Sequence, residues 1–236
     1  MNKFKSIKKQ LYFCIQSMEA SSSLFVVDSE RDFTRRRKHL FGNTMLNVIL
    51  LEAGSLKDEL LTLFGHTLNA PTVSSFVQAR DKIRPDAFYT LFKRFNSKTH
   101  ATILHKGFRL LAIDGSVLPI SNAIQDKETT VMKQNQTDVP FSAYHINTSY
   151  DLLEHTYDDV LIQGQAQMNE NGAFNHIVDR YHGPKAIFIG DRGFESFNSF
   201  VKVDKSKNKF LIRVKDIHSK TSILRSLGPF EDKEFD

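Results

Sequence analysis

The sequence has a single cysteine and no apolar stretch long enough to cross a membrane. Cys14 alone cannot form an intramolecular disulfide or a CxxC pair for a metal or for redox chemistry. The apolar run near the start, LYFCI at 11–15, is shorter than the ~7 to 15 residues of a signal-peptide core and the ~20 that span a bilayer. We therefore expect a cytoplasmic protein in a reducing compartment, with no membrane among its partners.

Several motifs of well-known enzyme classes are also missing. The chain contains no GxxxxGK[ST], GxGxxG, GxSxG or HExxH pattern. Their absence argues against a P-loop nucleotide hydrolase, a dinucleotide-binding enzyme, a serine hydrolase of the α/β type and a zinc peptidase. The composition, 40% hydrophobic and 25% charged, is that of an ordinary folded protein, so any chemistry must come from other residues.

The excess positive charge is concentrated at one end of the chain. The net charge is +5, and residues 1–40 account for all of it, with nine Lys or Arg against four Asp or Glu. The densest part is the cluster Arg35, Arg36, Arg37 and Lys38. Such a cluster suits double-stranded DNA, because it neutralises phosphates and releases counterions. A charged face that is only solvated is an equally good interpretation.

Up to about residue 100 the apolar spacing is helical. It predicts helices near 55–64, 72–83 and 85–98, with Ser55 as the cap of the first and Pro85 in the first turn of the third. These segments indicate antiparallel helices joined by tight turns. A helix-turn-helix that binds DNA is one interpretation, and a helical hairpin that serves only packing is the other.

After about residue 105, short apolar runs separated by turn residues predict a mixed α/β sheet with helices on its faces. The first strand, 109–114, is expected to end where Gly115 breaks it, and the polar stretch 121–140 is expected to be a long loop. His145 is expected to be a half-exposed strand residue. The later elements are strand, strand, helix, strand, helix and strand, at 141–153, 155–164, 174–181, 186–191, 194–203 and 209–214.

Two aspartates in this half combine a strand end with a glycine. Asp114 precedes Gly115, and Gly193 follows two residues after Asp191. Reactive groups gather at the carboxyl ends of strands in open α/β sheets, although Asp and Gly are also ordinary turn residues. If the first and fourth strands are neighbours, the two carboxylates converge and can share a cation. Oxygen ligands favour Mg²⁺ or Mn²⁺ over Zn²⁺, and two such ions can promote in-line attack on a phosphodiester.

Several segments, taken in order, resemble insertion-sequence transposases of the DDE type, in the insertion-sequence-four group. They are DFTRRRKHLFGNTM, SLKDELL, VSSFVQARDKI and DAFYTLFKRF, followed by the more specific LLAIDGSVLPI and IFIGDRGFESFN. The similarity runs from about residue 32 to residue 214. It implies an RNase H-like catalytic core over 104–236, after a helical DNA-binding region over 1–103.

The resemblance also implies roles for particular residues. Asp114 and Asp191 match the first and second catalytic aspartates of the family, which bind Mg²⁺ or Mn²⁺. Arg192 belongs to the second motif and is expected to support DNA. The implied activity is DNA transposition, in which DNA is cleaved and a strand transferred at transposon ends. The implied partners are double-stranded DNA and a second copy of the chain on it.

The third carboxylate of the family is missing from its usual place. It belongs to a later helix, within a signature of Tyr, Arg, Glu and Lys, and no tyrosine follows Tyr181 here. Glu195 is too close to Asp191 in the chain to replace it, and Glu231 and Glu234 lie in a polar tail. We therefore expect an incomplete core and a chain that is inactive, or nearly so, by itself. Two alternatives stay open: a DNA-binding remnant that interferes with full-length transposase, and a metal-dependent hydrolase of small phosphate esters.

Overall fold

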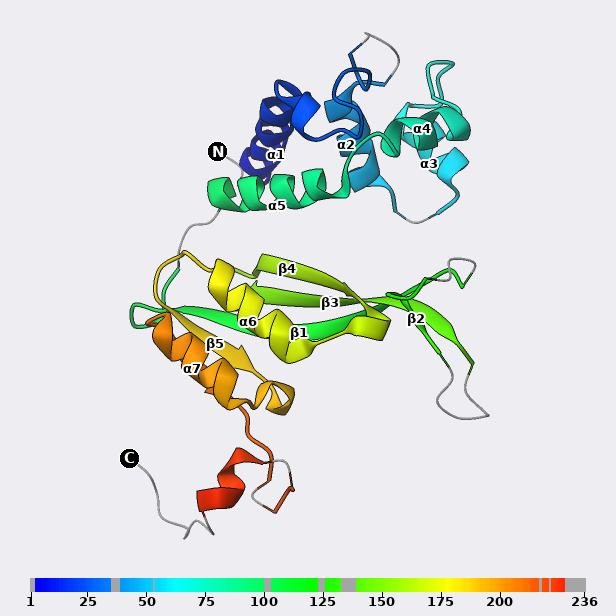
Figure 1. Ribbon diagram of the computed structural model, residues 1–236. Helices are drawn as coiled ribbons and strands as arrows, with labels where there is room; N and C mark the ends of the chain where they lie inside the picture. Colours follow the sequence, from blue (N-terminus) through cyan, green and yellow to red (C-terminus); the bar gives the residue numbers. More distant parts are fainter. Residues whose placement is uncertain are drawn as a thin grey trace. The chain divides into compact units, whose positions relative to one another are not determined.

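The computed structural model describes residues 3–34, 39–52, 54–99, 103–122, 126–132, 139–216, 218–220 and 222–227. The chain divides into two units, Met1–His100 and Ala101–Asp236. The first is helical, and the second is a six-stranded mixed sheet with flanking helices (Figure 1). The fold class expected from the sequence, a helical region followed by a mixed α/β sheet, is confirmed.

The helices of the first unit enclose an apolar core. Their apolar faces converge on side chains such as Met18 and Met45, which are completely buried. Ser55, predicted as a cap, makes no side-chain cap bond, whereas the Thr72 hydroxyl accepts a hydrogen bond from the Ser75 N–H at 3.2 Å. The last three helices correspond to those predicted from the sequence. The helices are α1 (Lys3–Glu19), α2 (Phe41–Leu50), α3 (Leu56–Leu63), α4 (Val73–Arg80) and α5 (Pro85–Thr99).

The second unit is a sheet in the order β2-β3-β1-β5-β6, with β4 paired to β3. Strand β1 is antiparallel to β3 and parallel to β5, and β6 is parallel to β5. Helix α6 connects β4 to β5, and α7 connects β5 to β6. The elements are β1 (Arg109–Ile120), β2 (Thr130–Val131), β3 (Phe141–Asp151), β4 (Thr156–Gly164), α6 (Glu170–Arg180), β5 (Ala186–Gly190), α7 (Phe197–Lys205) and β6 (Lys209–Ile212).

Strand β1 does not end at Asp114, so that prediction is wrong. The strand continues to Ile120, because the antiparallel ladder with β3 runs the whole way and places Ile120 opposite Ser142. Only the pairing with β5 stops earlier, with Ala112 opposite Ile189. The polar stretch that follows is not all loop either, since β2 lies within it and pairs with β3.

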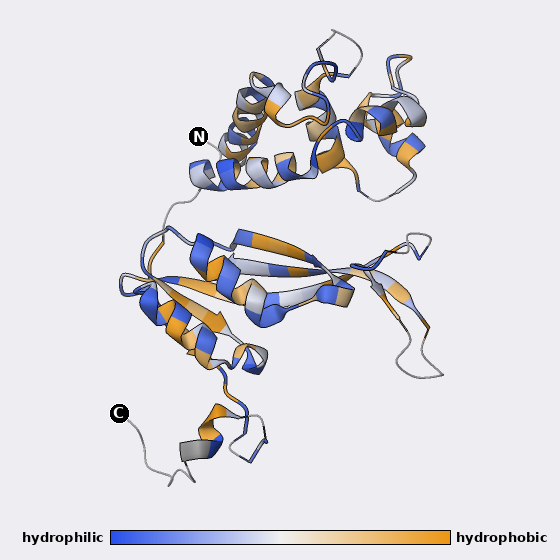
Figure 2. Ribbon diagram, viewed as in Figure 1, coloured by the Kyte–Doolittle hydropathy of each residue, from blue (hydrophilic) through white to orange (hydrophobic). Residues whose placement is uncertain are grey.

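Helices α6 and α7 cover one face of the sheet. Leu111 and Phe188 are register partners on β1 and β5, and both are completely buried. Phe174 of α6 lies edge-on to Phe188, with 6.2 Å between the ring centroids, and Val203 brings α7 into the same cluster. Figure 2 shows apolar β5 beside α7, whose hydrophobic and hydrophilic residues alternate. Each buried side chain of this size contributes about 1.5 to 3 kcal/mol, so this core holds α6 and α7 against β1 and β5.

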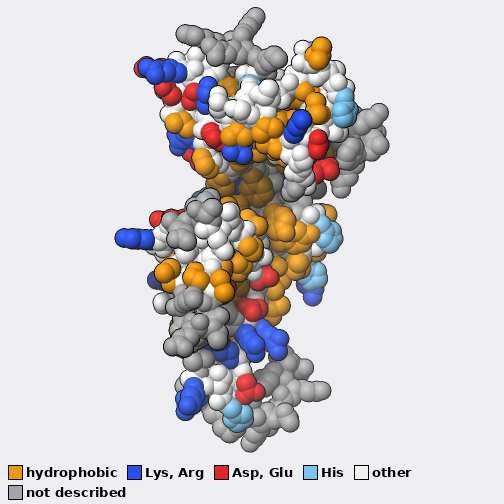
Figure 3. All heavy atoms as spheres, turned by 90° about the vertical axis from the view of Figure 1, so that its right-hand side faces the viewer, with side chains coloured by type: hydrophobic (Ala, Val, Ile, Leu, Met, Phe, Trp, Pro, Cys, Tyr) orange, Lys and Arg blue, Asp and Glu red, His pale blue; other side chains and the backbone are white. Residues whose placement is uncertain are grey.

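Apolar side chains are also exposed on the sheet near β2. Leu118 of β1 and Tyr144 of β3 are register partners, and Ile162 of β4 lies on the same face; all three are more than a third exposed. Figure 3 views the second unit from the end that carries β2 and shows apolar side chains on its surface.

None of the helices in the described part of the chain combines the length and the apolar character that a membrane span requires.

Candidate active site

The register of the sheet brings Asp114 and Asp191 to the same level. Ala112 of β1 and Ile189 of β5 are the last pair of this ladder, and continuing the same register two residues further brings Asp114 to the level of Asp191, just past the end of β5. Asp191 has an extended backbone, with φ −80° and ψ −177°, and continues the line of β5. Adjacent strands lie about 4.8 Å apart, and residues in register point to the same face. The prediction that these two strands are neighbours is confirmed, and both aspartates lie near the level where β5 ends.

Both carboxylates are exposed and only partly hydrogen-bonded. Asp114 Oδ1 accepts from the Gly115 N–H at 2.8 Å, and Asp191 Oδ1 accepts from the Gly193 N–H at 2.7 Å. Within the described residues, Oδ2 of each aspartate has no hydrogen-bond partner and neither forms an ion pair. Each aspartate therefore keeps an oxygen available for a ligand.

Gly115 is required by a close contact rather than by a turn. A Cβ added there would lie 2.4 Å from Nε2 of His145, which reaches across from β3. His145 is 4% exposed and not half-exposed as expected, and neither ring nitrogen makes a hydrogen bond within the described residues. Its Nε2 lies 3.4 Å from Oε1 of Glu170, in the first turn of α6. His145 thus lies between the strand that carries Asp114 and the start of α6.

Glu170 brings a third carboxylate to this edge. Helix α6 runs antiparallel to β5 and ends near the start of that strand. The 11 residues of α6 rise about 16 Å, and the five residues of β5 span about 17 Å. The first turn of α6 therefore lies beside the end of β5. A Cβ added at Gly193 would lie 3.0 Å from Asp191 Oδ1 and 3.5 Å from Glu170 Oε2. The missing side chain at Gly193 therefore keeps open a space that both carboxylates border.

The side-chain oxygens at this edge are of the chemical type that a hard divalent cation binds. Carboxylate oxygens are the ligands that Mg²⁺ and Mn²⁺ prefer, and the space beside Gly193 is one that a side chain would fill. As the side chains stand, no group of three or more His, Cys, Asp or Glu among the described residues is arranged to hold a metal ion. The geometry therefore provides two level aspartates and a nearby glutamate, and not a closed metal cage.

Two exposed arginines flank the aspartates. Arg192 directly follows Asp191 and begins a short 3-10 helix. Arg213 directly follows β6 and lies level with Asp191, since its N–H donates to the carbonyl oxygen of Gly190 at 3.1 Å and continues the ladder between β5 and β6. Neither arginine forms an ion pair with a residue that the structure describes. The other predicted DNA contacts lie outside the described residues: Arg35, Arg36, Arg37 and Lys38.

At the start of β1 the carboxylates have an internal partner. Arg109 donates from Nε to Asp151 at 2.8 Å and from Nη1 to Asp158 at 2.7 Å, and its side chain is 7% exposed. Burial alone would lower the pKa of Arg109, but the two carboxylates outweigh it and raise that pKa, so the arginine stays charged. Burial raises the pKa of Tyr181, whose ring faces this guanidinium. Because each carboxylate here already faces a cation, this network is structural.

Glu195 also has a structural role. Its carboxylate accepts hydrogen bonds from the Lys215 N–H at 2.7 Å and the Ile223 N–H at 2.6 Å. Burial by itself would raise the pKa of Glu195, but hydrogen bonds from Ile223, Lys215 and Ser222 outweigh it, so that pKa lies below its ordinary value. Glu195 therefore holds the segment that follows β6 and is not available to a metal.

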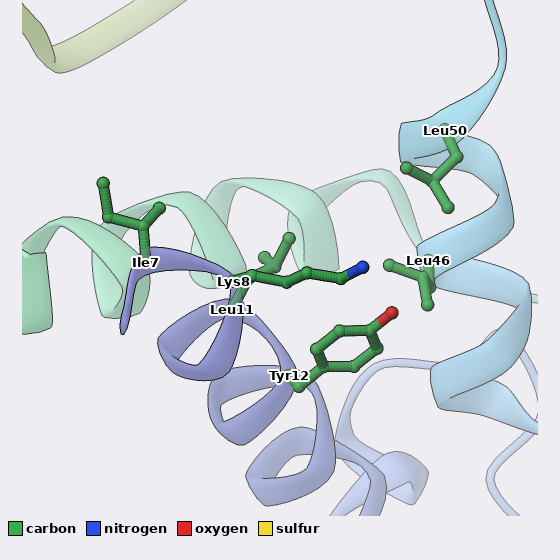
Figure 4. Close-up of a pocket in the computed structure, with 6 residues that line it drawn as sticks. All are labelled: Ile7, Lys8, Leu11, Tyr12, Leu46 and Leu50. Atoms are coloured by element: carbon green, nitrogen blue, oxygen red, sulfur yellow. The ribbon is translucent and has the colours of Figure 1, made fainter. Parts of the chain in front are cut away.

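The first unit contains a hollow of a different kind, between α1 and α2. Its volume is about 310 Å³. The ammonium group of Lys8 lies 5.9 Å from the centre of the Tyr12 ring. The lining contains one charged group and no carboxylate, so it offers nothing that could bind a divalent cation. Figure 4 shows the lining residues, which are Ile7, Lys8, Leu11, Tyr12, Leu46 and Leu50.

Comparison with protein-family models, with curated proteins and with solved structures found no match for this chain. The site is therefore interpreted from its own geometry. Sequence reasoning missed Glu170 and Arg213, because neither lies in a recognisable motif. The available signals were positional: Glu170 opens the helix that precedes β5, and Arg213 follows directly after the last strand.

Proposed function

We propose that the chain is a transposase-family protein of the DDE type, with an RNase H-like core, that acts on DNA at transposon ends by metal-dependent phosphoryl transfer. The observation that carries the proposal is the pair Asp114 and Asp191, level on adjacent parallel strands, exposed and without an internal cation. When bound there, Mg²⁺ or Mn²⁺ would activate a water or a 3′-hydroxyl and stabilise the leaving oxygen of a phosphodiester.

The residues around this edge have separate tasks in the proposed reaction. Asp114 and Asp191 hold the ion. Arg192 and Arg213 bind backbone phosphates beside the scissile bond, which positions the DNA without reading its sequence. Because both aspartates are exposed, a double helix has access to them, and this favours DNA over a small phosphate ester as the substrate.

The remaining parts of the proposal concern the setting. The basic cluster at 35–38 contributes further phosphate contacts, and a second copy of the chain joins the first on paired DNA ends. A cytoplasmic location agrees with a single cysteine, Cys14, that is buried and free.

A DNA-binding protein without catalysis is the second candidate. It is favoured by the lack, among the described residues, of three carboxylates arranged around one ion. The family signature that carries the third carboxylate is also not found in the sequence. Such a protein would occupy transposon ends and interfere with a full-length transposase.

Both candidates can be tested with the DNA that flanks the coding sequence, because the proposed transposon ends lie there. In a gel shift, either candidate binds these ends more tightly than unrelated DNA of equal length, whereas a hydrolase of small esters does not. With labelled ends and Mg²⁺ or Mn²⁺, we expect at most slow nicking by this chain alone. Asp114→Ala and Asp191→Ala should each abolish it, while Asp179→Ala, a surface carboxylate of α6 paired with Lys202, should not. Binding without nicking identifies the second candidate, and the absence of end binding rejects both.

A further inference from the structure

We propose that Glu170 is a metal ligand of the candidate site, a third carboxylate that α6 adds beside Asp191. The inference rests on the proposed function, because it completes the same metal site. It also departs from the expectation drawn from the resemblance, in which the third carboxylate comes from a helix later in the chain.

The first support is the position of the Glu170 carboxylate. Its Oε2 and the Oδ1 of Asp191 both lie within 3.5 Å of the point where a Cβ at Gly193 would be. Mg²⁺ binds oxygens at about 2.1 Å, so a rotation of the glutamate side chain would bring its carboxylate and that of Asp191 within reach of one ion. Glycine at position 193 leaves that space free.

The second support is His145, a buried polar side chain that points at Glu170. Its side chain is 5% exposed, and neither ring nitrogen makes a hydrogen bond within the described residues. A buried imidazole without hydrogen bonds is costly, so its presence at this edge calls for a partner. The contact of 3.4 Å between Nε2 and Glu170 Oε1 is longer than a well-formed hydrogen bond. His145 therefore acts as a positioning residue that keeps the Glu170 carboxylate beside the site.

In the structure Oε1 of Glu170 is directed at His145, and no group of carboxylates among the described residues is closed around an ion. The Glu170 side chain is 38% exposed and lies in the first turn of a helix, so the core leaves it room to rotate toward Asp191 when an ion binds. Within the described residues no Lys or Arg pairs with it. A carboxylate in this place also interacts favourably with the helix dipole, so a test must separate metal binding from helix stabilisation.

Binding of Mn²⁺ to the full 236-residue chain, without DNA, tests the inference by titration calorimetry and by the electron paramagnetic resonance signal of free Mn²⁺. We expect the Mn²⁺ affinity to fall at least about tenfold in Glu170→Gln and in Asp191→Asn. The matched control is Asp179→Asn, an exposed carboxylate near the other end of α6, which should bind like wild type. Gly193→Ala should also lose affinity, because its Cβ would fill the space although every carboxylate remains. Circular dichroism and urea denaturation check that each variant folds.

The outcomes separate this inference from the proposed function. If Glu170→Gln binds Mn²⁺ like wild type while Asp191→Asn does not, Glu170 is not a ligand and the proposed function stands. If Glu170→Gln loses helix stability and Mn²⁺ together while Gly193→Ala binds normally, Glu170 only stabilises the helix and the inference fails. If wild type binds no Mn²⁺ at millimolar concentration, the inference and the metal part of the proposed function both fail, and the gel shift decides separately whether DNA binding remains.

Discussion

Carboxylates lie beside strand β1 at two places, and at only one of these places does the structure pair them with a cation. At its start, buried Arg109 pairs with Asp151 and Asp158. At the level where β5 ends, Asp114 and Asp191 are exposed and have no ion pair among the described residues. The carboxylates are thus paired with a cation where they are largely buried, and they have no such partner where they are exposed to a cation and a substrate. This difference separates carboxylates that stabilise the fold from carboxylates placed for a diffusible ion.

The largest effect is expected from Arg109→Met. This change leaves Asp151 and Asp158 without their cation, and removing one partner of a buried ion pair costs about 3 to 5 kcal/mol of the free energy of unfolding. Urea denaturation measures that free energy. In the control Arg213→Met, an exposed arginine is removed and the change should stay below about 0.5 kcal/mol. Equal losses in the two variants would show that the start of β1 is not specially stabilised.

A smaller loss is expected from Gly115→Ala, next to Asp114. The new Cβ would lie 2.4 Å from Nε2 of His145, which is too buried to move aside, so the free energy of unfolding should fall by about 1 to 3 kcal/mol. Adding His145→Ala should recover most of this loss, and a double-mutant cycle measures the coupling. If the changes in unfolding free energy of the two single variants simply add in the double variant, Gly115 and His145 are not in direct contact, and Gly115 is only a turn residue.

Glu195→Gln tests a carboxylate whose main partners are hydrogen-bond donors, with the charge of Lys215 as a smaller contribution. Because the pKa of Glu195 is below its ordinary value of 4.5 in the folded state, its ionised form stabilises the protein above that value, and this stabilisation is lost as the pH falls through the lower, folded pKa. The variant should lose about 1 to 2 kcal/mol at pH 7, where hydrogen bonds to the charged group are present in wild type. Unfolding free energies at several pH values check this. The difference from wild type should shrink below pH 4.5 and would contradict the assignment if it grew.

The smallest effect is expected from Asp114→Asn in the absence of metal. An exposed carboxylate without an ion pair should change the free energy of unfolding by less than about 0.5 kcal/mol in either direction. Asp151→Asn is the matched comparison and should cost clearly more, because Asp151 is fully buried against Arg109. If Asp114→Asn is as costly as Asp151→Asn, the distinction between the two kinds of carboxylate is wrong.

The order of helices and strands from α3 to β6, apart from β2, was predictable because it depends on local apolar spacing, whereas α1, α2 and β2 were not predicted. The adjacency of the strands that carry Asp114 and Asp191 was stated as a condition, and the register confirms it. The extension of β1 past Gly115 was not predictable, because it depends on pairing with β3, which lies far along the chain. An Asp followed by Gly usually indicates a turn, but here position 115 is a glycine because a Cβ there would collide with His145.

The side chains that face α6 were also hidden from pattern reasoning. In β3 the polar His145, Asn147 and Ser149 are buried, while Ile146 and Tyr150 on the other face are only partly covered. This reverses the usual rule that the apolar face of a strand points to the core. The position of Glu170 depends on the direction in which α6 returns to β5, which no local pattern records.

The continuity of β1 has a dynamic consequence. Asp114 lies within an unbroken ladder, with Thr148 of β3 opposite, whereas Asp191 lies beyond the last paired residue of β5 and begins a short turn. In hydrogen–deuterium exchange, the amides around Asp114 should therefore exchange far more slowly than that of Arg192. An ion held by both aspartates would then slow exchange mainly in the turn, since the slowly exchanging strand sets the place of binding and the turn adjusts to it.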